Sequence, residues 1–212
     1  MIQKITLRDQ VRKYLQQEML DRNITFGERI SLAEIARKIE VSVTPIREAL
    51  TQLEQAGIVS MIANRGFFVP ELTIREANEI YPIIMNLECM GLMQSEYASS
   101  DFKDLMQIQS DFRNANNKEE AVKQDLHFHE TLLRNYQNDT AKRILTDLKI
   151  RVFFYELEYM NHHGNIEKSA VAHDDLMKSL KRKDIQQALN LLKENWEVSL
   201  KFLCDHSRIS VG

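Results

Sequence analysis

The sequence is poor in cysteine, proline and glycine. Two cysteines, Cys89 and Cys204, occur in 212 residues and lie far apart, which argues against a disulfide framework or a metal cluster of thiolates. We expect both to be buried free thiols. Three prolines and six glycines, in a chain where Leu, Lys, Glu and Ala are common, favour helices over sheets.

Long apolar runs and a large charge of either sign are also missing. No apolar run approaches the roughly 18 residues of a membrane span, and the N-terminus lacks the charged-apolar-small order of an export signal. The sequence therefore predicts a cytoplasmic protein without a membrane partner. The net charge is −3, yet residues 1–70 carry ten Lys/Arg against eight Asp/Glu, whereas residues 71–212 carry eighteen against twenty-three. So small a basic excess does not by itself indicate DNA binding.

The stretch from Val41 to Glu54 has the pattern of a helix that reads DNA. Ser42 or Thr44 can cap a helix whose first turn accepts Pro45. Apolar side chains then recur at spacings of three and four, and polar ones fall on the opposite face. The apolar set is Ile46, Ala49, Leu50 and Leu53, and the outward set is Arg47, Thr51 and Gln55. A helix of this kind fits the major groove of DNA.

Two shorter helices and a hairpin surround this stretch. Residues 7–20 have apolar residues at helical spacing, and Ser31 with Glu34 forms a capping box for a helix that runs to about Ile39. Downstream, apolar strands at 58–62 and 67–69 flank Asn64-Arg65-Gly66, a turn that needs a residue at positive φ. The order helix, helix, helix, hairpin predicts a winged helix-turn-helix over residues 1–70.

These blocks resemble the GntR family of bacterial transcription regulators. The resemblance rests on five matching segments in order, namely 27–30 (Gly-Glu-Arg-Ile), 41–50, 53–54, 57–59 and 64–67. It implies a homodimer that binds an inverted-repeat operator in double-stranded DNA. This chain departs from the family at Val43, where arginine is frequent, and at Glu40, which replaces the usual turn glycine. The operator sequence of relatives therefore does not carry over.

The resemblance assigns the DNA contacts to three groups of residues. Arg47 is the expected base contact, with Thr51 on the same outward face. Phosphates are expected at Ser42 and Thr44, and backbone or minor-groove contacts at Asn64 and Arg65 of the wing. Arg37 and Lys38 are further candidates for phosphate contacts, with solvated helix surface as the alternative.

A second, all-helical region follows the wing. Thr73 and Glu76 form a capping box at its start, and breaks between periodic segments predict six helices at 73–98, 101–115, 118–136, 139–160, 165–181 and 184–206. This region, residues 71–212, resembles the FadR-type effector domain (FCD) in its smaller, VanR-like form with six helices. The resemblance implies a mainly α fold in which an antiparallel helical bundle binds an effector and forms the dimer.

A possible metal site lies within these helices. Asp125 and His129 are four residues apart and share one helical face, and His173 on the fifth helix of this region is the natural third ligand. The three match the family's metal pattern, but Asn195 stands where the family has a fourth histidine. An amide oxygen is a weaker ligand than imidazole for zinc or nickel. The alternative is a hydrogen-bonded polar core without an ion.

The effector pocket departs from the family as well. Relatives that bind carboxylates place an arginine at the position of Ile84, so Arg151 is the remaining cation for an anionic group, unless it is salt-bridged. Phe128 and Tyr155 belong to an aromatic set at helical spacing, which core packing explains in large part. If they line a cavity, the effector is an apolar or singly anionic acid.

We therefore expect a DNA-binding transcriptional regulator, by default a repressor, and not an enzyme. Its operator affinity would be controlled by a small-molecule effector in a domain that contains a divalent metal ion. Two alternatives are a metal sensor without an organic effector and a metal-dependent hydrolase that uses Asp125, His129 and His173.

Overall fold

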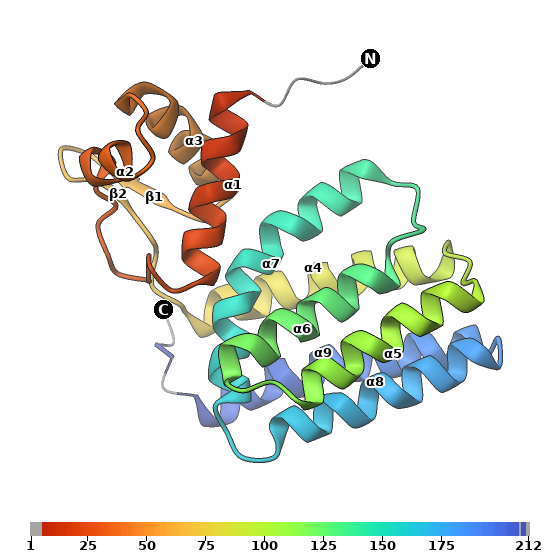
Figure 1. Cartoon of the computed structure of the whole chain (residues 1–212). Coiled ribbons are helices and arrows are strands. Elements are labelled where there is room, and N and C mark those ends of the chain that lie inside the picture. Colours follow the sequence, from red (N-terminus) through yellow and green to blue (C-terminus); the bar gives the residue numbers. More distant parts are fainter. Residues whose placement is uncertain (1–5, 208, 211–212) are drawn as a thin grey trace. The chain divides into compact units, whose positions relative to one another are not determined.

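The computed structural model describes residues 6–207 and 209–210, and the chain divides into two compact units. The first unit ends at Glu71 and the second begins at Leu72, one residue beyond the boundary expected from the sequence. Each unit has its own core, and Figure 1 shows the short hairpin of the first and the long helices of the second.

The first unit contains three helices in the order that the sequence predicts. They are α1 (Leu7–Leu20), α2 (Leu32–Lys38) and α3 (Val43–Gln55). Ser31 caps α2 by accepting a hydrogen bond from the amide of Glu34, as expected, whereas Ser42 occupies the N-cap of α3 without a side-chain capping bond. The helices enclose a core of Val11, Leu15, Met19, Ile35, Ile46, Ala49, Leu50 and Leu53.

The wing is an antiparallel pair of β1 (Ser60–Ile62) and β2 (Gly66–Phe68), in which Ser60 faces Phe68. Asn64 at φ 61° and Gly66 at φ 96° make the tight turn between them, which is the positive-φ geometry expected from the sequence. The segment before α2 runs along the other edge of β2, because the amide of Ile30 donates to the carbonyl of Phe67. The wing is thereby attached to the body of the unit.

The second unit is built from six helices among the described residues. They are α4 (Ile74–Met93), α5 (Ser99–Arg113), α6 (Lys118–Leu132), α7 (Asp139–Met160), α8 (Asn165–Lys181) and α9 (Ile185–His206). Helix α9 packs against α4, α7 and α8, and α6 packs between α5 and α7 (Figure 1). The largest fully buried side chains in this bundle are Trp196, Tyr81, Tyr136, Tyr155, Tyr159, Phe112, Phe128 and Phe153.

Several details differ from the sequence-based expectation, among them the bounds of α5, which is Ser99–Arg113 rather than 101–115. Helix α4 ends at Met93 rather than 98, because the Ser95 hydroxyl donates to the carbonyl of Gly91 and the chain turns away. Helix α6 ends at Leu132 rather than 136. Cys89 is buried as expected, but Cys204 is exposed, so the expectation of two buried thiols is wrong for the second.

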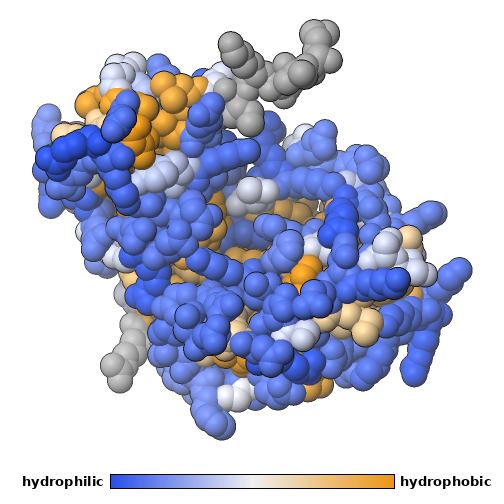
Figure 2. Space-filling view, viewed as in Figure 1, coloured by the Kyte–Doolittle hydropathy of each residue, from blue (hydrophilic) through white to orange (hydrophobic). Residues whose placement is uncertain are grey.

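Polar residues cover most of the visible surface. Figure 2 shows hydrophilic side chains over most of this face, with hydrophobic residues gathered in small areas. No helix within the described part of the chain combines the length and the apolar character needed to cross a membrane.

Candidate functional site

The expected DNA contacts lie on the surface of the first unit. All of these residues are exposed: Ser42 at the N-cap of α3, Thr44, Arg47 and Thr51 on α3, Asn64 and Arg65 on the wing, and Arg37 and Lys38 on α2. Thr44, Arg47 and Thr51 are exposed because they lie opposite the apolar face of α3, and that face packs into the core of this unit.

Some of these side chains have partners inside the protein. Lys38 forms an ion pair with Glu18 at 2.6 Å and lies over the ring of Tyr14, so a phosphate would have to compete for it. The Thr51 hydroxyl donates to the backbone carbonyl of Arg47. The guanidinium of Arg65 lies 5.5 Å from the centre of the Phe68 ring.

A groove of about 390 Å³ lies between the start of α2, the start of α3 and the wing, and its walls include Arg29, Val43, Arg47 and Gly66. Arg29, which belongs to the motif at residues 27–30, places a second cation in the wall of the same groove as Arg47. The turn before α3 keeps its left-handed conformation, with Glu40 at φ 54° in place of glycine.

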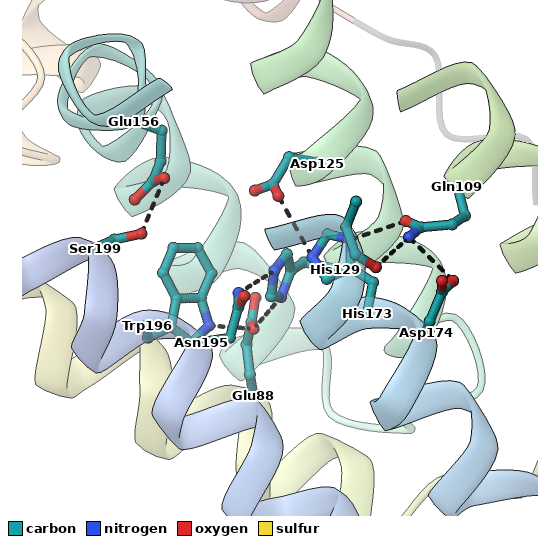
Figure 3. A network of polar contacts seen from close by, with 11 residues as sticks. Glu88, Gln109, Asp125, His129, Glu156, His173, Asp174, Asn195, Trp196 and Ser199 are labelled. Carbon is teal, nitrogen blue, oxygen red and sulfur yellow. Dashed lines mark hydrogen bonds and ion pairs between the residues drawn. The ribbon is translucent and has the colours of Figure 1, made fainter. Parts of the chain in front are cut away.

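The second unit brings Asp125, His129 and His173 together, as the sequence predicts. All three are buried, and each offers a ligand atom within 4.8 Å of those of the other two. Asp125 and His129 come from one face of α6 and His173 comes from α8 (Figure 3). His173 stacks on Phe128, with ring centres 4.0 Å apart, so Phe128 restricts the orientation of this imidazole.

Hydrogen bonds orient both imidazoles towards this common centre. The Nδ1 of His129 lies 2.8 Å from Oε2 of Glu88, and because a carboxylate only accepts, Nδ1 carries the proton. The Nδ1 of His173 lies 3.0 Å from Oε1 of Gln109. The amide of Gln109 is oriented by its NH₂ group, which donates to the carbonyl of Ala170 and to Asp174. In the neutral rings both Nε2 atoms are therefore left as acceptors.

These acceptors face other groups across the centre. The Nε2 of His173 lies 3.4 Å from Oδ1 of Asp125, and neither atom has a hydrogen-bond partner. Two acceptors in contact repel unless a proton or a cation lies between them. Two ligands of one tetrahedral ion with bonds of ~2.0–2.1 Å are roughly 3.3–3.4 Å apart. The arrangement thus fits a divalent metal ion.

Asn195, on α9, contacts one of the two imidazoles. Its Nδ2 lies 3.4 Å from Nε2 of His129, so in this orientation the amide donates to the imidazole. Rotation of the amide would exchange the donor for the acceptor Oδ1. Asn195 therefore lies next to Nε2 of His129.

Burial sets the protonation of these groups. It lowers the pKa of His173 well below its usual value, with help from nearby His129, and so favours the neutral ring. Burial raises the pKa of Asp125. Burial would also raise the pKa of Glu88, but His129 and Lys149 outweigh it and bring the pKa to about 2, which leaves a carboxylate that can hold Nδ1–H of His129.

Glu156 forms a second buried polar group behind the centre. It accepts hydrogen bonds from Tyr81 at 2.7 Å and from Ser199 at 3.2 Å. Burial and the charge of Asp125 raise its pKa, which favours a protonated carboxyl near neutral pH.

Comparisons with known proteins bear on both units. Residues 7–69 match the family described as bacterial regulatory proteins, gntR family, and residues 79–197 match the FCD domain. The chain belongs to the GntR family, with an FCD effector domain. The FadR-type assignment is therefore confirmed. Because these proteins are transcription regulators and not enzymes, the hydrolase alternative is wrong.

Individual relatives agree with this assignment. The regulator is 27% identical over 170 residues to the HTH-type transcriptional regulator YdhC of Bacillus subtilis, covering 76% of this chain and 75% of that one. It is 26% identical over 184 residues to the gluconate operon transcriptional repressor of Bacillus licheniformis, covering 82% and 75%. The structure of E. coli McbR/YncC has a TM-score of 0.82 at 21% identity, covering 95% of this chain and 98% of that one. Its likeness establishes the fold.

The residues expected at the effector have varied surroundings in this GntR-family protein. Arg151 forms two hydrogen bonds to Glu76, from Nε at 2.9 Å and from Nη2 at 2.5 Å, and Tyr155 donates to the same carboxylate. Arg151 is therefore salt-bridged, the alternative that the sequence left open, and is not the free anion anchor that we expected. Tyr155 also serves the start of α4, where its hydroxyl contacts Thr73. Ile84 is fully buried in α4.

Sequence reasoning missed the groups that orient the imidazoles. Glu88 accepts from Trp196 Nε1 at 2.8 Å as well as from His129, and it pairs with Lys149 at 3.1 Å. A signal existed for Glu88, since a carboxylate among apolar neighbours of α4 must find partners when buried. No comparable signal singled out Gln109.

Proposed function

We propose that this regulator is a cytoplasmic, homodimeric repressor whose affinity for an inverted-repeat operator changes when a small organic acid binds beside a divalent metal ion in the FCD domain. The observation that supports it best is the contact between Nε2 of His173 and Oδ1 of Asp125, two buried acceptors without partners. A cation between them would remove their mutual repulsion.

The DNA-binding half of the proposal rests on α3 and the wing. A dimer would place two copies of α3 about one DNA turn apart, each in a major groove. Arg47 would contact bases, with Thr51 beside it, while Ser42 and Thr44 would donate to phosphates at the start of the helix. Asn64 and Arg65 would reach the backbone or the minor groove.

The metal half rests on the chain's own ligands. Asp125, His129 and His173 would hold the ion, and Asn195 would contribute Oδ1 after rotation of its amide. Imidazole ligands suit zinc or nickel. A bound ion would supply a positive charge and a Lewis-acid position for an oxygen of the effector. Glu88 and Gln109 would keep both rings in the ligand tautomer.

Regulation would follow from differential binding. An effector alters operator affinity only if it binds more tightly to one of two arrangements of the winged helices. The relatives named as regulators and as a repressor support transcriptional control, with repression relieved by ligand as the proposed sign.

The test begins with selection of operator sequences from random DNA by the full-length protein. The affinity for the selected site is then measured after chelation, with zinc or nickel, and with zinc plus organic acids. We expect tight binding to the selected site and a change in affinity when metal and acid are both present. Equal affinity for selected and random DNA would overturn the proposal.

A metal sensor is the second candidate, because the two unpartnered acceptors support an ion whatever the effector. In that case zinc or nickel alone would switch operator affinity, and no acid would add to the effect. An acid response that requires the metal would instead favour the first candidate.

A further inference from the structure

A recess of about 300 Å³ lies between the end of α6 and the first half of α7. Its walls include three cationic side chains, Arg134, Lys142 and Lys149, and one carboxylate, Glu130. Cations therefore outnumber carboxylates among the lining side chains. Its volume lies at the lower end of the ~300–1,000 Å³ typical of small-molecule pockets.

Lys149 is the buried member of this set. The residue is 4% exposed, so its ammonium depends on partners other than bulk water. Its ammonium forms an ion pair with Glu88, whose Oε1 lies 3.1 Å from Nζ. An ammonium has three N–H donors, so one carboxylate does not use all of them, and the side chain of Lys149 forms part of the wall of the recess.

The two outer cations are held in place at the rim. Arg134 pairs with Asp104 at 2.5 Å, and Lys142 donates to the backbone carbonyl of Arg134 at 2.9 Å. A carbonyl does not neutralise an ammonium, so Lys142 keeps its full charge. The rim can thus attract an anion towards Lys149.

We infer that this recess binds the anionic group of a small organic acid, and that Lys149 is the cation that pairs with it. The inference rests on the proposed function, in which an acid is the effector. Leu133 and Leu145 in the wall would contact the apolar part of the ligand. Lys149 thus takes the role that the sequence suggested for Arg151, which lies two residues further along α7 and is bound to Glu76.

The recess is linked to the metal centre through one carboxylate. Glu88 faces Lys149 with Oε1 and accepts from Nδ1 of His129 with Oε2. An anion that draws the ammonium away would leave Glu88 a stronger acceptor for His129, which makes Nε2 a better metal ligand. Zinc and the acid therefore bind more tightly together, and by reciprocity each raises the affinity of the other by the same factor.

The experiment measures acid binding to the full-length protein without DNA. Calorimetric titrations use benzoate, succinate, citrate and inorganic phosphate, with benzamide and succinamide as neutral counterparts, in chelated and in zinc-loaded protein. We expect at least one organic acid to bind, its amide not to bind, and zinc to tighten the binding. Lys149→Met should weaken the binding of that acid by more than about 10-fold, because it removes the buried cation that pairs with the anionic group.

Two variants guard against misfolding. Lys149→Met combined with Glu88→Gln removes both charges of the ion pair together, and Arg134→Gln changes a side chain that is 47% exposed. The first should still fail to bind, and the second should weaken binding by roughly 2- to 5-fold. Lys201→Met, at an exposed position of α9, is the matched control and should bind as the wild type does.

The outcomes separate this inference from the proposed function. An acid that binds Lys149→Met and Arg134→Gln as tightly as the wild type, or a panel in which no acid binds, overturns the recess as the site. An operator response to acid that survives Lys149→Met does the same and leaves the proposed function intact. Acid binding through Lys149 without any change in operator affinity supports the site and contradicts the proposed function.

Discussion

Asp125→Asn should raise the stability of the metal-free protein and lower that of the zinc-loaded protein. In the wild type, Oδ1 of Asp125 and Nε2 of His173 are buried acceptors 3.4 Å apart with no donor between them. An asparagine can present its NH₂ group to Nε2 and form the missing hydrogen bond. The same change removes the one anionic side chain among the three candidate ligands.

The magnitude follows from the number of unsatisfied atoms. Each buried acceptor without a partner costs about 1–3 kcal/mol, and one new hydrogen bond recovers part of this for both atoms. We expect a net gain of about 1–2 kcal/mol, or roughly 3–6 °C in Tm for a chain of this size. With zinc at 100 times its Kd, the wild type gains ~2.7 kcal/mol, which the variant loses. The variant is therefore expected to be more stable than the wild type in chelator and less stable than the wild type in zinc.

The assay is thermal unfolding followed by circular dichroism at about pH 8, in chelator and in zinc. Burial raises the pKa of Asp125, so at lower pH the protonated carboxyl can itself donate to His173, and the advantage of the variant should shrink. Asp205→Asn, at an exposed position, is the control and should leave the thermal stability unchanged in chelator and in zinc. A variant that is less stable than the wild type in chelator at pH 8 would refute the reasoning.

Three further changes test other parts of the structure. Arg47→Ala should cost about 1–3 kcal/mol of specific operator binding, measured as the ratio of affinities for selected and random DNA. Glu156 has its pKa raised by burial, so the folded state holds its proton more tightly and stability should fall as the pH rises above about 4.5 through the folded pKa, by at most ~1.4 kcal/mol per pH unit. Glu156→Gln should flatten this fall in denaturant unfolding. Gly91→Ala should destabilise by about 1–3 kcal/mol, because its Cβ would lie 2.5 Å from Cδ2 of buried Leu133.

Each of these predictions has a matched control. Lys13→Ala removes an exposed cation from α1 and should leave operator discrimination unchanged. Glu197→Gln on the exposed face of α9 should keep the pH dependence of the wild type. Met93→Ala, at an exposed position of the helix that contains Gly91, should not destabilise. Controls that behave like the test variants would contradict the local reasoning in each case.

The helices and the family were predictable because their signals are local. Thr73 and Asn138 cap α4 and α7 where the sequence places the helix starts, since a cap acts within three residues of itself. The ends of α4 and α6 were less predictable. Ser95, which ends α4, acts through a side-chain bond to a backbone carbonyl that competes with the helical pattern.

The candidate metal ligands were predictable as residues, but the hydrogen bonds that orient them were not. The four-residue spacing of Asp125 and His129 alone places them on one face of a helix. The tautomers and orientations of His129 and His173 depend on hydrogen bonds to Glu88 from α4 and to Gln109 from α5. Both partners lie far away in the sequence. No local pattern reports such a contact.

The sequence by itself determined the class of protein, the amphipathic helix that carries Arg47, and which residues form the cluster of Asp125, His129 and His173. The tertiary structure alone decided which cation meets Glu76 and which meets Glu88 and the recess. Lys149 and Arg151 are two residues apart and therefore point about 200° apart around the helix. Both are basic residues on α7, and only the packing of α4 and α6 against it determines what each side chain contacts.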